Sequence, residues 1–267
     1  MVNGARIVAM AATLTVSTRA AKVFLFYLGL LLVAPYQESL AWLDPPVAAK
    51  QIYSPVGTGR ITGRVIVAGS YKKPKPLPVF KNRSFCGARV PNETLLVGRE
   101  GGLRNAIVTL HPVDRKGSAE PIEVVLDNKR CAFAPHVQVA TLGSELLLKN
   151  SDPILHTVHA RIGQETLFNI GLPTWRQVTK RLNRLGVVRI DCDVLHTWMS
   201  AAIIVTDTPY FAVSDQNGNF LIERLPAGEY HAEIWHEKLG SKTVRVALYG
   251  NGVTSLDVVY SSANGSL

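Results

Sequence analysis

A short stretch in the second half of the chain holds three side chains that could bind one metal ion. Cys192, His196 and Met199 lie within eight residues, directly after the strand-like run 186–191. Sulfur ligands suit Cu(I) and imidazole nitrogen suits Cu(II), so this combination is what a copper ion requires of a short loop. Such a site still needs one more histidine from elsewhere in the chain.

His156 is the candidate for that further histidine. It lies in the stretch 150–159, which ends a second strand pattern and turns through an Asp-Pro pair. Each of these residue types alone is weak, because a buried cysteine or methionine usually serves packing. Their combination in this order and in this strand context predicts a metal site. The predicted ligands are His156, Cys192, His196 and Met199.

Two parts of the chain resemble the two halves of a cupredoxin, a plastocyanin-like blue copper domain. The first half is matched by Phe133-Ala134-Pro135, Val137, Val139, Gly143, Leu146-Leu147-Leu148, Asn150, Asp152 and His156-Thr157-Val158. The second half is matched by residues 186–199, so the resemblance covers residues 131–206, under a third of the chain. In that family a histidine of the first part joins a cysteine, a histidine and a weak axial methionine of the second. The resemblance therefore implies copper as the cofactor and the same four ligands.

The spacing in the second part departs from the plastocyanin pattern. That pattern usually has a longer gap between histidine and methionine, whereas Cys-x3-His-x2-Met is similar to the loop that holds a dinuclear copper centre. The first cysteine of the dinuclear loop would fall at Val188, which cannot bridge two ions. The resemblance therefore implies a mononuclear site with Met199 as the axial ligand.

The carboxyl-terminal part has the pattern of a β-meander. Asn-Gly pairs at 217–218 and 251–252 separate alternating runs, and both residues of such turns must tolerate positive φ. The stretches 215–220 and 225–230 resemble the end of a carboxypeptidase regulatory-like, transthyretin-type β-sandwich. The pattern Gly-x-Ile-x-Gly-x-Val at 59–65 resembles the start of such a module.

We therefore predict an all-β chain: a Greek-key cupredoxin-like sandwich or barrel and a transthyretin-like sandwich. Residues 58–126 and 207–261 could form the transthyretin-like sandwich, with the cupredoxin-like domain of residues 131–206 inserted between them. Two sequential domains would give the same sequence pattern. No stretch shows sustained helical periodicity.

The first 41 residues have the pattern of a secretory signal peptide. Three basic residues precede the apolar run 23–34, and Ser39-Leu40-Ala41 offers a small-residue cleavage site. The apolar run is short for a membrane-spanning helix. We expect a periplasmic or secreted protein with no membrane span after cleavage and a linker at 42–57. An uncleaved anchor is the alternative.

In an oxidising compartment the three cysteines can have two different roles. Cys86 and Cys131 can form a disulfide, which leaves Cys192 free for a metal ion. The alternative is that Cys86 is only a small buried hydrophobe.

Composition and motifs indicate which partners and which classes of function we expect. The net charge of +9 favours an acidic partner, although a mixed solvated surface would give the same count. No motif indicates nucleic-acid binding. The chain lacks a Gly-x-Ser-x-Gly elbow, a phosphate loop and a His-Glu-x-x-His motif, so we do not expect an enzyme.

These observations predict a one-electron carrier that serves a redox partner protein, with His196 as the expected route of the electron. One alternative is a surface- or carbohydrate-binding module on a cupredoxin scaffold without metal, but the retention of all four ligand types favours copper. Another is a protein that stores or delivers copper without redox turnover, for which His136 and His159 would be extra ligands.

Overall fold

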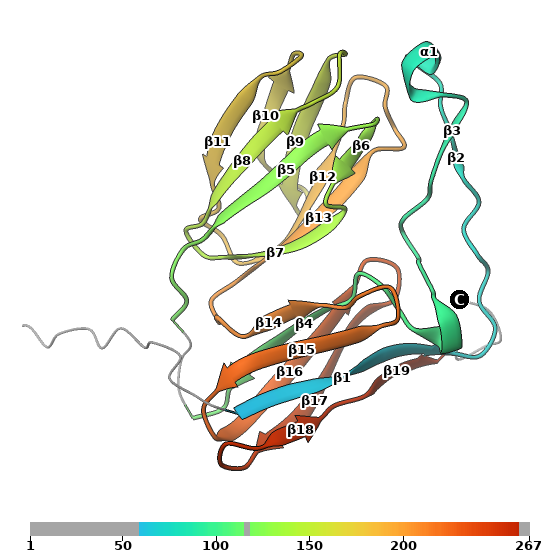
Figure 1. The fold of residues 1–267 in the computed structure, drawn as a ribbon. Helices are drawn as coiled ribbons and strands as arrows, with labels where there is room; N and C mark the ends of the chain where they lie inside the picture. The colour runs from blue at the N-terminus through green and yellow to red at the C-terminus, as the bar shows by residue number, and fades with distance from the viewer. Residues whose placement is uncertain (1–58, 115–117, 262–267) are drawn as a thin grey trace, which may run out of the picture. The chain divides into compact units, whose positions relative to one another are not determined.

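The computed structural model describes residues 59–114 and 118–261, and the regular secondary structure of these residues is almost entirely β-strand (Figure 1). The prediction of an all-β chain is confirmed. In these two ranges no helix is both long and apolar enough to cross a membrane. The predicted signal peptide (1–41) and linker (42–57) lie outside the described residues.

The first β-sandwich combines strands from both ends of the described chain. One of its sheets contains β1 (Gly59–Ala68), β15 (Asn219–Leu225), β18 (Val253–Ser255) and β19 (Val258–Ser261). The other contains β4 (Ile107–Pro112), β14 (Phe211–Val213), β16 (Gly228–His236) and β17 (Gly240–Leu248). Side chains alternate along a strand, so Ile61, Val65 and Val67 of β1 share one face and lie in the core between the sheets.

The second β-sandwich is formed by the middle of the chain. Its five-stranded sheet has the order β10 (Glu165–Leu172), β9 (His156–Ile162), β12 (Gly186–Asp191), β13 (Ser200–Thr206) and β7 (Val137–Thr141). Its four-stranded sheet has the order β11 (Gln177–Arg181), β8 (Glu145–Asn150), β5 (Glu123–Lys129) and β6 (Ala132–Ala134). Leu148 of β8 and Ile190 of β12 belong to one buried hydrophobic cluster, so the two sheets share a core.

Between β1 and β4 the chain makes a long excursion. We call residues 77–90 of this excursion the arm. It contains β2 (Leu77–Pro78), the one-turn helix α1 (Arg83–Cys86) and β3 (Arg89–Val90), and a short 3-10 helix, η1 (Arg99–Gly101), follows it. β2 and β3 pair with each other. Val79 and Val90 are buried in the core of the second sandwich, and a disulfide joins Cys86 to Cys131. The predicted disulfide is therefore confirmed.

The structure differs from the sequence-based predictions in two places. β5 pairs in parallel with β8, so the second sandwich includes a strand that precedes residue 131, its predicted start. The alternation of polar and apolar residues within a strand does not reveal which distant strand it pairs with. The sequence therefore placed the start of the second sandwich too late in the chain. The sequence shows no helical periodicity, and the one-turn helix α1 is too short to produce it.

Candidate metal centre

The predicted ligands come from two segments that meet at one edge of the five-stranded sheet. β9 begins at His156 and β12 ends at Asp191, and these strands are antiparallel neighbours. The start of β9 therefore lies beside the loop that follows β12. Cys192 and His196 lie in that loop, so the strand pairing brings them next to His156.

Three donor atoms face one another at a spacing that fits a single metal ion. The Nδ1 atoms of His156 and His196 are 3.1 Å apart, and Sγ of Cys192 lies 3.9 Å from the first and 3.7 Å from the second. A circle through these three atoms has a radius of about 2.1 Å, close to the roughly 2.0–2.3 Å of metal–nitrogen and metal–sulfur bonds. Within the described ranges these residues form the one such group of potential ligands.

The site is almost closed to water. His156 and His196 have exposed fractions of 0%, and those of Cys192 and Met199 are 4% and 2%. Thr157 donates a hydrogen bond from its backbone N–H to Sγ of Cys192 at 3.3 Å. A backbone N–H donor at the sulfur stabilises the negative charge that a cysteine carries as a metal ligand.

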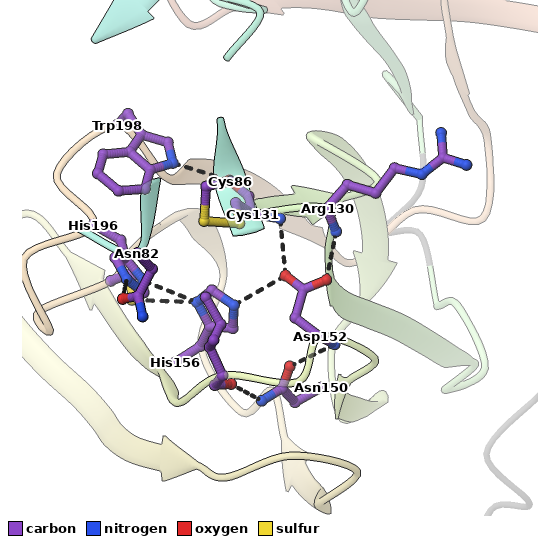
Figure 2. Close-up of a disulfide and its surroundings, with 11 residues drawn as sticks. Asn82, Cys86, Arg130, Cys131, Asn150, Asp152, His156, His196 and Trp198 are labelled. Atoms are coloured by element: carbon purple, nitrogen blue, oxygen red, sulfur yellow. Dashed lines mark hydrogen bonds and ion pairs between the residues drawn. A yellow bond between two sulfur atoms is a disulfide. The ribbon is translucent and has the colours of Figure 1, made fainter. Parts of the chain in front are cut away.

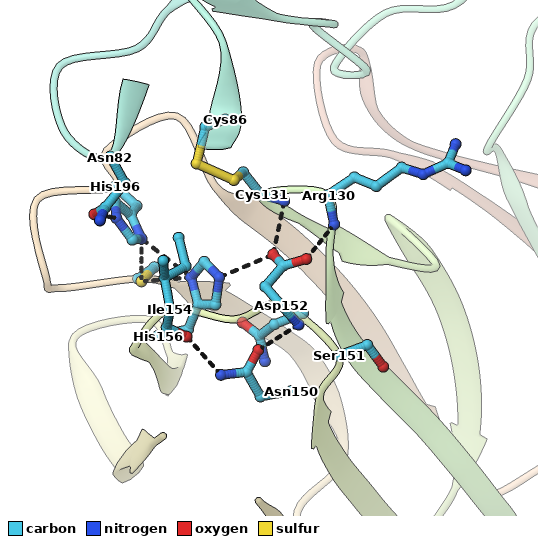
Figure 3. A network of polar contacts seen from close by, with 12 residues as sticks. Asn82, Cys86, Arg130, Cys131, Asn150, Ser151, Asp152, Ile154, His156 and His196 are labelled. Atoms are coloured by element: carbon cyan, nitrogen blue, oxygen red, sulfur yellow. Dashed lines mark hydrogen bonds and ion pairs between the residues drawn. A yellow bond between two sulfur atoms is a disulfide. The ribbon is translucent and has the colours of Figure 1, made fainter. Parts of the chain in front are cut away.

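A buried carboxylate orients His156 (Figure 3). Nε2 of His156 lies 3.0 Å from Oδ2 of Asp152, and a carboxylate oxygen can only accept, so Nε2 carries the proton and Nδ1 presents its lone pair. The backbone N–H groups of Arg130 and Cys131 donate to Asp152 at 2.6 and 2.8 Å. Asn150 accepts a bond from the N–H of Asp152 at 3.0 Å, which fixes the turn before His156. Such partners set both the tautomer and the direction of a metal-binding histidine.

An amide oxygen orients His196 in the same way (Figure 2). Nε2 of His196 lies 2.9 Å from Oδ1 of Asn82, a residue of the arm. Because this oxygen accepts, Nδ1 of His196 is again the nitrogen that faces the other ligands. Sequence reasoning missed Asn82, since nothing in its local pattern relates it to a histidine 114 positions away. Asp152 was part of the family resemblance, but its contact with His156 was not predicted.

Burial keeps both ligand imidazoles neutral at ordinary pH. It lowers the pKa of His156, although Asp152 opposes this effect. Burial also lowers the pKa of His196 to about 4, and the charges of His156 and Lys81 act in the same direction. Neutral imidazoles are the form that binds a metal ion, so the site does not depend on releasing a proton from either ring near pH 7.

These shifts predict that the metal-free protein loses stability in acid. Burial likewise lowers the pKa of His236 to about 4, so three histidines resist protonation in the folded chain. Between about pH 6.5 and pH 4 the unfolded chain binds protons that the folded chain does not. The free energy of unfolding should therefore fall by up to about 1.4 kcal/mol per pH unit for His196 and for His236, and the lowered pKa of His156 acts in the same direction.

Urea unfolding of the metal-free protein at pH 6.5, 5.5 and 4.5 measures this slope. His136 should not obscure this slope. Burial lowers the pKa of His136, but the hydrogen bond with Glu237 outweighs burial and leaves the pKa raised. The contribution of His136 to the free energy of unfolding therefore changes above pH 6.5. A free energy of unfolding that stays constant between pH 6.5 and pH 4.5 would contradict the prediction.

Replacing Asp152 by asparagine should weaken metal binding by about 10- to 100-fold. Asp152 accepts hydrogen bonds from His156, Arg130 and Cys131, and an amide has a single oxygen to accept them. At least one buried N–H would face the amide NH2 group, at a cost of about 1–3 kcal/mol in stability. Copper titration and urea unfolding measure the two effects.

Asp127→Asn is the matched control, because Asp127 accepts bonds from Ser151 and none from a histidine in the described structure. Its copper affinity should stay within about twofold of the unmodified protein. Equal effects of the two substitutions on affinity would show that Asp152 does not act through His156.

Trp198 packs beside His196, and Met199 follows it in the same buried cluster. Both side chains are buried in the same hydrophobic cluster as Cys192, and the backbone N–H of Met199 donates to the carbonyl of His196 at 2.8 Å. The Trp198 ring lies 5.0 Å from the His196 ring, and its Nε1–H donates to the carbonyl of Cys131 at 3.0 Å. Trp198 thus shields the site from water. The role of Met199 as axial ligand stays a prediction.

The two further histidines considered as extra ligands bind other groups. His159 contacts Asp193 at 2.9 Å and Thr166 at 2.8 Å. His136 contacts Glu237 at 2.6 Å and the carbonyl of Ser200 at 3.0 Å. Neither belongs to the group formed by His156, Cys192 and His196.

No protein-family model and no curated protein matches the chain. Among solved structures, a purple cupredoxin from Nitrosopumilus maritimus is similar over 32% of this chain and 99% of its own, with 18% identity and a TM-score of 0.28. A reduced amicyanin mutant is similar over 36% of this chain and 98% of its own, with 16% identity and a TM-score of 0.28. A copper-containing nitrite reductase from Thermus scotoductus is similar over 36% of this chain and 25% of its own, with 20% identity and a TM-score of 0.29.

Proposed function

We propose that this protein is an exported electron carrier that holds one copper ion between His156, Cys192 and His196. The observation that carries the proposal is the triangle of two Nδ1 atoms and one Sγ atom, buried and sized for one ion. Two imidazoles and one thiolate in a plane, with a weak axial thioether, form a donor set typical of copper sites that transfer electrons. Met199 is the proposed axial ligand.

The arrangement of the ligands suits a change of oxidation state with little movement. When bound, copper supplies the one-electron couple. His156 and His196 are each held by a hydrogen bond at Nε2, and Cys192 by the N–H of Thr157, so the protein fixes all three donors in advance. Ligands that need not move lower the reorganisation that accompanies electron transfer. Burial excludes water as an additional ligand.

The same features argue against the alternatives. A protein that delivers copper must let its ligands exchange with a recipient, but both histidines here are fully buried and hydrogen-bonded. In the described structure three of the four predicted ligands lie together, which gives no support to the alternative of a scaffold that has lost its metal. We accordingly propose a non-enzymatic role. The carboxypeptidase regulatory-like nature of the first sandwich, its possible carbohydrate ligand, an acidic redox partner and a periplasmic or secreted location stay predictions.

Titration of the purified protein with Cu(II), followed by reduction and reoxidation, tests the proposal. We expect one copper per chain, an intense visible band and a reversible one-electron couple over repeated cycles. Tight binding of Cu(I) alone, without colour and without reoxidation, would favour storage or delivery instead. No binding of copper to protein with a free Cys192 thiol would contradict the proposal.

A further inference from the structure

The arm brings a residue from outside the cupredoxin-like segment into the metal centre. Asn82 lies between β2 and α1, and its side chain reaches Nε2 of His196 at 2.9 Å (Figure 2). His196 has no exposed surface, so an electron that takes the expected route through it must pass a covering group before it reaches a partner. The ring nitrogen that points away from Cys192 is therefore occupied by the arm and not by water.

The backbone of Asn82 is adapted to this position. Its φ of 56° and ψ of 34° lie in the left-handed region, which asparagine tolerates better than most residues. Its carbonyl accepts hydrogen bonds from the N–H groups of Phe85 and Cys86 at 3.0 and 2.9 Å. Its side chain makes no capping bond to the helix, so the amide is free to serve His196.

A single covalent link fixes the partners of both histidines (Figures 2 and 3). Cys86, four residues after Asn82, forms the disulfide with Cys131. The N–H of Cys131 donates to Asp152, which in turn holds His156. The acceptor for His196 lies on one side of the disulfide and the acceptor for His156 on the other.

We propose that Asn82 is a positioning residue of the metal centre, and that the disulfide-bound arm closes the centre over His196. This inference rests on the proposed function in taking copper as the ion. Asn82 accepts from Nε2–H and so keeps Nδ1 of His196 directed at Cys192 and His156. The outer boundary of the centre is then the arm, so an electron that leaves through His196 passes the Asn82 amide before it reaches the surface.

The test compares three variants. Asn82→Gly removes the acceptor and still permits the left-handed backbone, whereas Asn82→Asp keeps an acceptor oxygen at the same place. Asn105→Gly is the matched control, because Asn105 is also left-handed, with a φ of 64°, and its backbone N–H bonds to Ser214 near the first sandwich. Nitrogen-15 NMR of the metal-free proteins reports the tautomer of His196 and the exchange of its Nε2 proton.

We expect one Nε2–H tautomer with slow proton exchange in the unmodified protein and in Asn82→Asp. In Asn82→Gly the tautomer ratio should change by about fivefold or more, and exchange should be faster, since one buried hydrogen bond is lost. Asn105→Gly should behave like the unmodified protein. An unchanged tautomer and unchanged exchange in Asn82→Gly would overturn the inference.

A second readout uses the copper-loaded proteins. Asn82→Gly should shift the reduction potential relative to the unmodified protein, and Asn105→Gly should not. Failure of the chain to bind copper would contradict the proposed function. The NMR measurement needs no metal, so it would still decide whether Asn82 positions His196. An equal potential in all variants, with copper bound, would overturn the role of Asn82 in the metal centre.

Discussion

Replacing Cys192 by serine should abolish the intense visible band of the copper-loaded protein and lower copper affinity by more than about 100-fold. Cys192 is the chain's single free thiol, since the other two of its three cysteines form the disulfide. Its Sγ supplies one corner of the ligand triangle, 3.7 and 3.9 Å from the two histidine nitrogens. A serine hydroxyl is a harder and mostly neutral donor, so it replaces neither the charge nor the soft sulfur. The loss should therefore exceed the 10- to 100-fold typical of losing a partner of a ligand.

Absorption spectra and copper titrations of Cys192→Ser beside Thr197→Ser measure this effect. Thr197 is exposed in the same loop, so its substitution controls for disturbance of the loop itself. The control should keep both the band and the affinity. If Cys192→Ser kept them as well, the sulfur would not be a ligand.

Removing the disulfide should lower the free energy of unfolding by about 4 kcal/mol. Cys86 and Cys131 are separated by 45 positions, and the chain-entropy cost of closing a loop of that length is of this size. A domain with a total stability of about 5–15 kcal/mol would lose a large share of it. The suitable variant combines Cys86→Ser with Cys131→Ala, because Cys131 is fully buried and a serine there would add an unpaired hydroxyl.

Urea unfolding of this double variant, beside the unmodified protein under oxidising and reducing conditions, gives the comparison. The reduced unmodified protein should resemble the double variant. A loss below about 1 kcal/mol would mean that the unfolded chain is already compact around these residues and that the link does little for stability.

The cluster of His156, Cys192 and His196 could be predicted from the sequence, whereas their role as ligands, and that of Met199, stay predictions. Cys192, His196 and Met199 are close along the chain, and a loop after a strand keeps such residues close in space. His156 was added because it lies in a stretch that ends a second strand pattern, and the structure brings it near the other residues by placing the start of β9 beside the end of β12. The choice of His156 also depended on the family resemblance, because sequence spacing alone does not connect residues 36 positions apart.

The partners of the ligands were largely beyond sequence reasoning. Asn82 reaches His196 only because the arm crosses to the second sandwich, where Val79 and Val90 are buried and the disulfide fixes it. Each of these contacts joins segments distant in sequence, and local propensity contains no information on them. Asn150, which is part of the family resemblance, fixes the turn before His156 through its bonds to Asp152 and to the carbonyls of Ile154 and Leu172.

The fold shows the same division between local and distant information. Alternating patterns and Asn-Gly turns predicted strands such as β1 and β15, because burial of one face repeats every second residue. The start of the second sandwich was missed, because β5 owes its place to parallel pairing with β8. Helix α1 was also missed, since four residues held by the Asn82 carbonyl and a disulfide need no helical periodicity.

X-ray absorption at the copper edge, on oxidised and reduced protein, tests the central claim most directly. His156, Cys192 and His196 should appear as two nitrogen neighbours and one short sulfur neighbour in both states, with little change in distance between them. A longer sulfur distance from Met199 is compatible with this set. A copper ion surrounded by nitrogen and oxygen alone, or one that gains and loses ligands between the two states, would contradict the account.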